Sequence, residues 1–579
     1  MSAFLGVETS LSGRRWLGPD DDVLRRAAQL VQQADLSDPL ARILAARGIS
    51  PAEAAAHLAP TLRELMPDPT GLRDMEKAAA RFVLAMHGKE RIAIFADYDV
   101  DGGASAALIL CYLRARGLAA TLYIPDRIDE GYGPNTPAMA ELGAAHDLII
   151  CVDCGTLSHE PIAAAGCDVV VLDHHLGGET LPPAHAVVNP NRQDEAGNLG
   201  YLCAAGVVFL FLAQTNRVLR ETSKDTPDLM GLLDLVALAT VADIAPLVGF
   251  NRALVRQGLA VMAQRGNVGL AALADVAGMN RAPEAYHLGY LLGPRINAGG
   301  RVGAADLGAR LLATNDASEA QNLAKRLDVL NAERRAIEAD VQLSAIAQAE
   351  TRSTAGALVW AAGAGWHPGV VGIVAARLKE RFNRPAVVIG LDGGIGKGSG
   401  RSVNGVDLGG SIAKLVREGL LIAGGGHKMA AGLSLAEDQL DAAMERLTAL
   451  LKAQGAAAPG PRDLQITAAI GAGAATPDLL EDLARAGPFG AAAPAPRFAI
   501  ASARISFAKR AGETHLRLSL TDGHAKLDAI AFGAFTTPLG EALQSHGGAP
   551  FHFAGRLEID DWGGRRRAKL QLDDAAPAG

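Results

Sequence analysis

The sequence contains no long hydrophobic segment free of charged residues, and it contains little cysteine. A membrane-spanning helix needs roughly 18 such residues, so we expect no interaction with a membrane. Residues 1–15 lack a basic start followed by an apolar segment, so we expect no export signal. The five cysteines lie in apolar segments, and their odd number fits a reducing cytoplasm better than a disulfide framework. Cys151 and Cys154 form a Cys-x-x-Cys pair, for which a redox or zinc role is the alternative, but no second pair completes a zinc site.

A basic net charge is also absent. The 55 Lys and Arg residues are outnumbered by 63 Asp and Glu residues, and the net charge of −8 argues mildly against a nucleic-acid ligand. However, residues 497–569 contain 11 basic and 7 acidic residues, among them Arg565, Arg566 and Arg567. This local surplus could hold a single strand, although a run of arginines is also typical of a solvated surface.

Three aspartates alternate with other residues in a loop that follows an apolar segment. Residues 92–96 are apolar, and Asp97, Asp99 and Asp101 come directly after them. The apolar segment predicts a buried parallel strand, and ligands bind at the carboxyl edge of such sheets. Because neighbouring carboxylates repel one another, a divalent cation is the usual partner of such a cluster. We therefore predict a metal site here, the alternative being an acidic loop in water.

Three further apolar segments end in Asp or His. Two predicted strands end at Asp153 and at Asp173-His174-His175, and residues 232–242, more typical of a buried helix, end at Asp243. The carboxyl ends of parallel strands meet at one edge of a sheet, so these side chains can form one cluster. Carboxylates with imidazoles suit Mn²⁺, Mg²⁺ or Zn²⁺, and the scarcity of sulfur ligands favours the first two.

These motifs resemble the DHH phosphoesterase family, and within it the branch of bacterial exonucleases that degrade single-stranded DNA from 5′ to 3′. The shared segments, in the family's order, are residues 97–103, 124–127, 130–133, 152–155, 173–175, 240–243, 293–301, 366–372, 398–402 and 424–427. The resemblance implies two divalent ions, Mn²⁺ or Mg²⁺, with Asp153 bridging both. The implied ligands are Asp99, Asp101, Asp153, His174, His175 and Asp243.

The resemblance also implies roles for residues around the ions. Asp97 and Asp173, with His175, are the catalytic candidates; the two aspartates would orient water and hold imidazole tautomers, direct ligation being the alternative. Contacts to phosphate are implied for polar residues in glycine-rich motifs: Arg127, Arg295, Asn297, Arg301, Ser399, Arg401 and His427. Ser399 and Arg401 would clamp a terminal 5′-phosphate. Ordinary loop residues are the alternative, since such turns are common.

The 579 residues allow roughly three to five domains. We predict an α/β protein with a helical segment (1–75), a parallel-sheet DHH domain (76–250) and a helical region (251–350). Residues 316–350 of that region lack Gly and Pro and predict one helix of about 50 Å, the alternative being a coiled-coil dimer seam. The helix would lead to a second α/β domain (351–455) that resembles DHHA1, followed by a linker (456–461).

Alternating segments in residues 462–579 predict a small β-barrel, which the resemblance makes an OB fold that binds single-stranded DNA. Its candidates for base stacking are Phe507, Phe532, Phe535 and Trp562.

The predicted function is that of a metal-dependent exonuclease that converts single-stranded DNA to mononucleotides in DNA repair and recombination. A helicase and a single-strand-binding protein are the implied partners, and we expect a cytoplasmic monomer. Two alternatives stay open at this point: a phosphoesterase of small substrates, and a scaffold without activity. The long helix and the barrel argue against the first, and the complete ligand set argues against the second.

Overall fold

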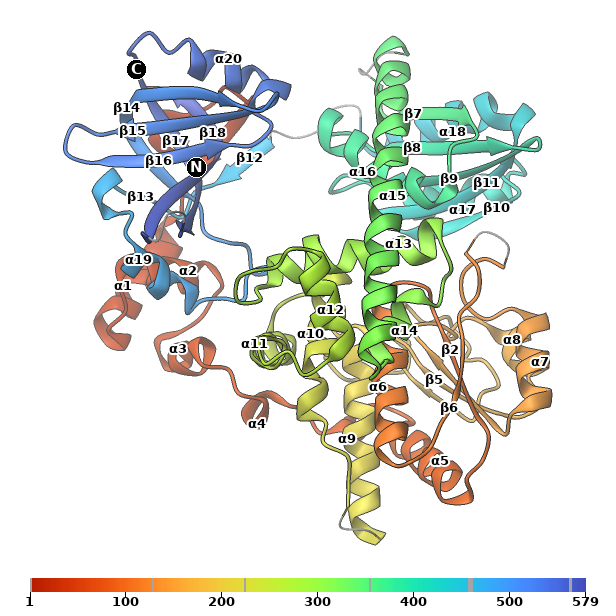
Figure 1. Ribbon diagram of the computed structural model, residues 1–579. Helices are drawn as coiled ribbons and strands as arrows, with labels where there is room; N and C mark the ends of the chain where they lie inside the picture. Colours follow the sequence, from red (N-terminus) through yellow and green to blue (C-terminus); the bar gives the residue numbers. More distant parts are fainter. Residues whose placement is uncertain are drawn as a thin grey trace. The chain divides into compact units, whose positions relative to one another are not determined.

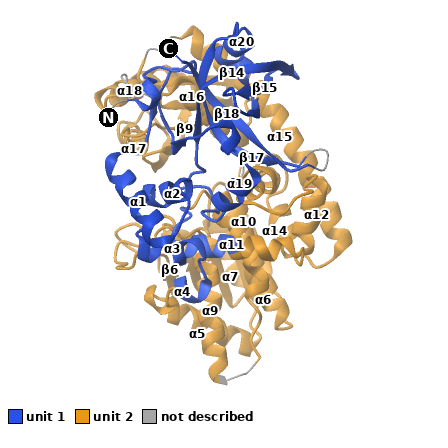
Figure 2. Cartoon of the chain, turned by 90° about the vertical axis from the view of Figure 1, so that its left-hand side faces the viewer, with its two compact units in different colours: residues 1–66, 246–256, 461–579 blue, residues 67–245, 257–460 orange. Residues whose placement is uncertain are grey.

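The computed structural model describes residues 3–127, 130–222, 225–352, 356–456, 462–561 and 565–578. The chain divides into two compact units: residues 67–245 with 257–460, here called unit 2, and residues 1–66 with 246–256 and 461–579, called unit 1 (Figure 2). Residues 457–461 of the predicted linker and the stacking candidate Trp562 lie outside the described residues. Within those residues, every helix is too short or too polar to cross a membrane.

Five parallel strands form the first sheet of unit 2, in the order β3-β2-β4-β5-β6. Three of them, β2, β5 and β6, are labelled in Figure 1. They are β2 (Ile92–Ala96), β3 (Thr121–Tyr123), β4 (Leu148–Val152), β5 (Asp168–Leu172) and β6 (Ala186–Val188). Along the chain, β3 follows β2 and pairs with one side of it, whereas β4, β5 and β6 continue the sheet from the other side of β2. The strand order therefore reverses between β2 and β4, and open α/β sheets bind ligands at such a point.

Helices cover both faces of this sheet. Side chains of α7 (Thr136–Ala145) and α8 (His159–Ala164) share one apolar core with the strands. The opposite face is covered by α5 (Met75–Gly88), α6 (Val100–Ala115) and α9 (Ala204–Thr222), which pack on one another and on the strands. Both β2 and β4 are buried along their whole length, as continuous apolar segments predict.

A helical region follows, and one long helix leads out of it. Its shorter members are α10 (Leu233–Ala242), α11 (Gly249–Ala263), α12 (Val268–Val276), the π-helical segment η4 (His287–Leu292), α13 (Gly293–Val302) and α14 (Leu307–Ala313). The long helix α15 (Ala317–Thr351) has 35 residues and is capped by Asp316, whose side chain accepts a hydrogen bond from the Glu319 amide. Its first half packs on α12 and α13, and its second half packs on the next sheet.

That second sheet of unit 2 is mixed, in the order β10-β11-β9-β8-β7. The strands are β7 (Val359–Ala364), β8 (Ala386–Asp392), β9 (Ile395–Arg401), β10 (Ala423–His427) and β11 (Ala430–Ala436). Only β7 and β8 among them pair in parallel. One apolar core joins the sheet to α15 and α16 (Pro368–Phe382), and another joins it to α17 (Leu408–Arg417) and α18 (Leu440–Ala453).

Unit 1 contains the predicted barrel. Strands β14, β15, β16, β18 and β17 pair in that order, and β14 also pairs with β17, which closes the sheet. Their bounds are β14 (Phe498–Ala511), β15 (His515–Thr521), β16 (Lys526–Ala531), β17 (Pro550–Asp560) and β18 (Arg567–Pro577). The short helix α20 (Pro538–Gln544) packs on the barrel core, and β13 (Ala468–Ala469) pairs in parallel with the start of β14. Phe507 and Phe532 are exposed, whereas Phe535 is partly buried against that core.

The N-terminal residues complete unit 1. Helices α1 (Asp21–Ala34), α2 (Asp38–Ala46) and α3 (Pro51–Leu58) share an apolar core with α19 (Pro477–Ala484), and α4 (Leu62–Leu65) follows them. Not all of this region is helical, because β1 (Arg14–Leu17) pairs in parallel with β12 (Arg462–Gln465). Trp16 of β1 is fully buried and donates a hydrogen bond of 2.9 Å from its indole nitrogen to Asp574. The predicted fold class, two α/β domains joined by a long helix and a barrel of the OB type, is confirmed.

Candidate metal centre and phosphate-binding residues

The loop after β2 is shaped by the start of α6. Asp99 is the N-cap, and its Oδ1 accepts hydrogen bonds from the amides of Asp101 (2.8 Å) and Gly102 (3.1 Å). A Cβ atom on Gly102 would lie 2.4 Å from the carbonyl oxygen of Asp97. Only glycine therefore lets the first turn of α6 pack this closely against the loop, and the turn places Asp97, Asp99 and Asp101 together.

A second helix holds Asp101. The carboxylate is buried, and its two oxygens accept hydrogen bonds from the amides of Ala204 (2.7 Å) and Ala205 (2.8 Å). These amides belong to the first turn of α9, where the helix dipole favours a negative charge. The side chain is therefore fixed in direction before any ion binds.

Asp153, at the end of β4, is held without such donors. Its backbone has a φ of 60°, a conformation that costs energy for any residue other than glycine. The side chain is buried, and its Oδ1 has no hydrogen-bond partner among the described residues. The same is true of Oδ1 of Asp97. The nearest cationic group to Oδ1 of Asp153 is Nε2 of His174, at 3.3 Å without hydrogen-bond geometry, so both buried carboxylates are short of donors and indicate a missing positive partner.

Asp173 holds the two histidines rather than pointing freely into the cluster. Its Oδ1 accepts hydrogen bonds from the amides of His174 (2.8 Å) and His175 (3.2 Å) and from Nδ1 of His175 (2.8 Å). Its Oδ2 accepts from the Thr156 amide at 3.0 Å. With both oxygens engaged in this way, Asp173 orients His175, whose Nε2 lies 3.2 Å from the hydroxyl of Tyr132.

Two asparagines that the sequence analysis did not identify support the same segment. The side-chain amide of Asn189 donates to the carbonyl oxygen of His175 (2.8 Å), and that of Asn191 donates to the carbonyl oxygen of His174 (2.6 Å). Both follow the end of β6, so they obey the same pattern of polar residues after an apolar strand. That pattern could have identified them.

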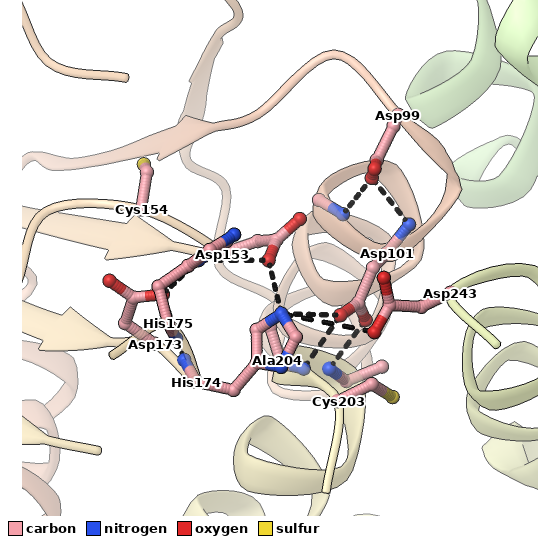
Figure 3. Close-up of polar contacts among 12 residues, drawn as sticks. Asp99, Asp101, Asp153, Cys154, Asp173, His174, His175, Cys203, Ala204 and Asp243 are labelled. Carbon is pink, nitrogen blue, oxygen red and sulfur yellow. Dashed lines mark hydrogen bonds and ion pairs between the residues drawn. The ribbon is translucent and has the colours of Figure 1, made fainter. Parts of the chain in front are cut away.

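All six predicted ligands, which are labelled in Figure 3, lie in one cluster, and Asp97 belongs to it as well. Nε2 of His174 lies 3.3 Å from Asp153, 3.8 Å from Asp101 and 3.9 Å from Asp243. The atoms that could bind an ion form three overlapping groups, each within 4.8 Å: Asp97, Asp99 and Asp153; Asp153, His174 and His175; Asp101, His174 and Asp243. Because Asp153 and His174 each belong to two groups, the arrangement offers adjacent positions for more than one ion.

The electrostatics of the cluster call for cations. Burial, together with repulsion from neighbouring carboxylates, raises the pKa values of Asp153 and Asp97 well above their ordinary range. The same causes raise the pKa of Asp243 to about 8. The pKa of His175 rises to about 9, because its hydrogen bond and ion pair with Asp173 outweigh the effect of burial. Oxygen donors with unpaired lone pairs, together with imidazole nitrogen, fit a hard divalent ion such as Mn²⁺ or Mg²⁺.

Three of the predicted phosphate ligands lie within electrostatic reach of one another. Burial, with the nearby charge of Arg127, lowers the pKa of Arg301 to about 10 and also lowers that of Arg401. Arg127 also acts on Asp97, so these cations adjoin the acidic cluster. In the described ranges, none of the three guanidinium groups forms an ion pair with a carboxylate. Mutually repelling, unpaired cations beside a metal centre form a site for an anion.

The other predicted phosphate ligands have different surroundings. Arg295 forms an ion pair with Asp328 (2.9 Å), and Asn297 accepts a hydrogen bond from the Val100 amide (3.0 Å), which supports the start of α6. Ser399 accepts a hydrogen bond of 2.9 Å from Arg401. His427 is exposed on β10, in the same cross-strand row as Arg401, with one residue of β11 between them. That row spans about 10 Å at the usual strand spacing.

Comparison with known proteins places this site in a family. Models of the DHH family N-terminal domain, the DHHA1 domain and the RecJ OB domain match residues 91–240, 354–453 and 466–574. The single-stranded-DNA-specific exonuclease RecJ of Dickeya dadantii is 36% identical over 560 residues, covering 93% of this chain and 96% of that protein. The RecJ of Escherichia coli is 34% identical, covering 94% of this chain and 96% of that protein.

The chain belongs to the RecJ family. A solved RecJ structure, that of Thermus thermophilus in complex with Mn²⁺, matches with a TM-score of 0.81 at 30% identity, covering 97% of this chain and 79% of that one. The same RecJ in complex with Mg²⁺ matches with a TM-score of 0.75 at 28% identity, covering 97% of this chain and 78% of that one. Relatives of this fold thus bind the ions that the donor set of this chain fits.

Proposed function

We propose that this chain is a metal-dependent exonuclease that hydrolyses single-stranded DNA from its 5′ end and releases mononucleotides. The observation that carries the proposal is the buried cluster of carboxylates and histidines with Arg127 and Arg301 within electrostatic reach of it and Arg401 within reach of Arg127. An acidic centre alone would serve many hydrolases. Cations next to it add a place for a second phosphate, which a phosphodiester at a chain end supplies.

The side chains of the cluster have different roles in the proposed hydrolysis. When bound, two divalent ions would lower the pKa of the attacking water and neutralise charge on the phosphate. Asp99, Asp101, Asp153, His174, His175 and Asp243 are the proposed ligands, with Asp153 shared. Asp97 has an oxygen free to accept a hydrogen bond from the water, and Asp173 keeps His175 in the tautomer that presents Nε2.

The polarity of the enzyme would follow from the cationic pocket. A 5′-phosphate bound by Arg401, in bidentate fashion, and by Ser399 fixes the strand end, so that the next phosphodiester reaches the acidic cluster. Arg295 and Asn297 would contribute by holding the loops in place, and His427 by contacting a neighbouring phosphate. The barrel, with Phe507 and Phe532 exposed, would bind more distant nucleotides.

The setting of the enzyme is part of the proposal. A role in DNA repair and recombination requires single-stranded ends, which a helicase would supply and a single-strand-binding protein would keep open. The five cysteines are free thiols, which supports a reducing cytoplasm. A monomer is sufficient, because one chain holds both the acidic cluster and the cations.

Digestion of an oligonucleotide labelled at either end tests the proposal. With Mn²⁺, the single strand should release mononucleotides from the 5′ end and the duplex should be spared. Asp153→Asn should abolish product, whereas Asp147→Asn, at the exposed opposite end of β4, should not. Release from the 3′ end would contradict the assigned polarity, and product in Asp153→Asn would contradict the metal centre. Turnover of dinucleotides alone would favour a phosphoesterase of small substrates.

A further inference from the structure

Two tyrosines are exposed side by side on the surface of unit 2. Tyr286 is 64% exposed and Tyr290 is 75% exposed. Their ring centroids are 5.3 Å apart, and the ring planes differ by 24°, so the rings are stacked. Leaving two large rings in water forgoes the stabilisation that burial would give. Core packing therefore does not explain this pair.

The backbone under the pair is unusual and firmly held. Tyr290 lies in the π-helical segment η4, and Tyr286 is its N-cap residue. Short π-helical turns are rare and occur frequently at functional sites. Nδ1 of His287 accepts a hydrogen bond from the Glu284 amide (3.0 Å), and Arg295 donates to the Leu291 carbonyl oxygen (2.7 Å). The rings are thus presented on a fixed segment.

This segment packs against the end of the helix that carries a metal ligand. A Cβ atom on Gly289 would lie 3.3 Å from a methyl carbon of Val241, and one on Gly293 would lie 3.4 Å from Cβ of Ala242. Val241 and Ala242 directly precede Asp243 in the chain. The segment that carries the tyrosines therefore packs on α10, whose C-terminal end carries Asp243.

Helix α13 relates the pair to the cationic pocket. Its first residue, Gly293, lies against α10, and near its other end Arg301 donates to the Gly369 carbonyl oxygen and belongs to the pocket. The eight steps between these residues span about 12 Å. Tyr286 and Tyr290 precede Gly293 on the same helical stretch, so they lie toward its end remote from Arg301.

We propose that Tyr286 and Tyr290 form a stacking platform for bases of the single strand, downstream of the nucleotide that carries the 5′-phosphate. The proposal rests on the proposed function, because it places the 5′-phosphate in the cationic pocket. An aromatic face stacks on every base, so a platform of this kind tolerates any sequence. An exonuclease that advances along a strand needs such tolerance.

Binding without cleavage tests the platform directly. Fluorescence anisotropy would follow a 5′-phosphorylated thymidylate 12-mer with Ca²⁺ in place of the catalytic ion. Replacing both tyrosines by alanine should weaken binding about 10- to 100-fold, whereas replacing both by phenylalanine should retain it. Leu343→Ala, a change at a 70% exposed residue of α15, is the matched control and should change nothing. Equal affinity of the double-alanine variant and the wild type would overturn the platform. The exposed pair would then be interpreted as a contact for a protein partner.

Changes in the substrate provide a second, independent test of the platform. An abasic site is moved one nucleotide at a time along the strand. At the nucleotides that lie on the platform it should weaken binding of the wild type and of the double-phenylalanine variant but not of the double-alanine variant, because the base and the rings act as a coupled pair. A 5′-phosphorylated dinucleotide is too short to reach the platform, so its hydrolysis should be equal in the wild type and the double-alanine variant. If an abasic site weakened binding by the same factor in the wild type and in both double variants, the inference would be overturned. Absence of hydrolysis in the wild type would instead count against the proposed function, since the anisotropy result does not depend on it.

Discussion

Removal of divalent ions should make the stability of this protein fall as the pH rises from 6 to 8. The pKa of Asp243 is raised from 3.8 to about 8 by burial and by repulsion from Asp101 and Asp99. Below pH 3.8 the carboxyl is protonated in both the folded and the unfolded chain, so it has no effect on stability. Between 3.8 and about 8 only the folded state holds the proton, so each rise in pH favours unfolding.

His175 acts in the same direction. Its pKa is raised from 6.5 to about 9 by Asp173, so the charged ring stabilises the fold fully below 6.5 and loses this effect as the pH approaches 9. One such group changes the free energy of unfolding by at most about 1.4 kcal/mol per pH unit. Asp243 alone should therefore lower it by about 2 kcal/mol between pH 6 and 8, and His175 adds to this loss in the upper part of the range.

Calorimetry at pH 6, 7 and 8, in EDTA or in excess Mg²⁺, measures this effect. The Tm in EDTA should fall with pH, and Mg²⁺ should raise it most at pH 8, because the ligands must lose their protons before they bind an ion. Asp243→Asn should flatten the dependence, whereas Asp147→Asn, which changes an exposed carboxylate, should not. A Tm in EDTA that rises over this range, or an equal effect of Mg²⁺ at pH 6 and 8, would refute the reasoning.

Three further changes test individual contacts. Asp173→Asn places an amide against a buried N–H donor and should lower both kcat and metal affinity about 10- to 100-fold. Steady-state kinetics and metal titration measure these two quantities, and unchanged values would count against the positioning role of Asp173. Gly102→Ala should destabilise the protein by about 1–3 kcal/mol in urea unfolding, because its Cβ would collide with the carbonyl oxygen of Asp97, whereas Gly266→Ala, in open space, should be neutral. Arg401→Ala should raise KM about 10- to 100-fold for a 5′-phosphorylated strand and little for a 5′-hydroxyl strand, and an equal rise for both would remove it from the 5′-phosphate site.

The metal centre was accessible from sequence because its residues follow a simple rule. An apolar segment that ends in Asp or His predicts both a buried strand and the place where it meets a ligand, and Asp97, Asp153 and His174 all obey it. The long helix was equally accessible, since 35 residues without Gly or Pro leave few other structures. In both cases a local pattern carries the three-dimensional information.

Features that depend on distant pairings were not accessible in this way. Unit 1 is assembled from three separate parts of the chain, and β1 pairs with β12 across more than 440 residues. Neither strand has a sequence pattern that identifies the strand with which it pairs. Likewise, the burial of Asp574 against Trp16 gives a carboxylate a structural role that no local pattern distinguishes from a solvated acid.

The acidic residues of the centre differ in what stabilises their charge before an ion binds. Asp99 and Asp101 each accept two backbone hydrogen bonds at the start of a helix, α6 and α9 respectively. Asp97 and Asp153 each keep one buried oxygen without a donor, and their pKa values are raised well above the ordinary range. The helices thus hold one pair of carboxylates in place, although burial still raises the pKa of Asp101, while the other pair gains a partner only when cations arrive. Ion binding should therefore be coupled to deprotonation of the carboxyls whose pKa values burial raises, which are Asp97, Asp101, Asp153 and Asp243.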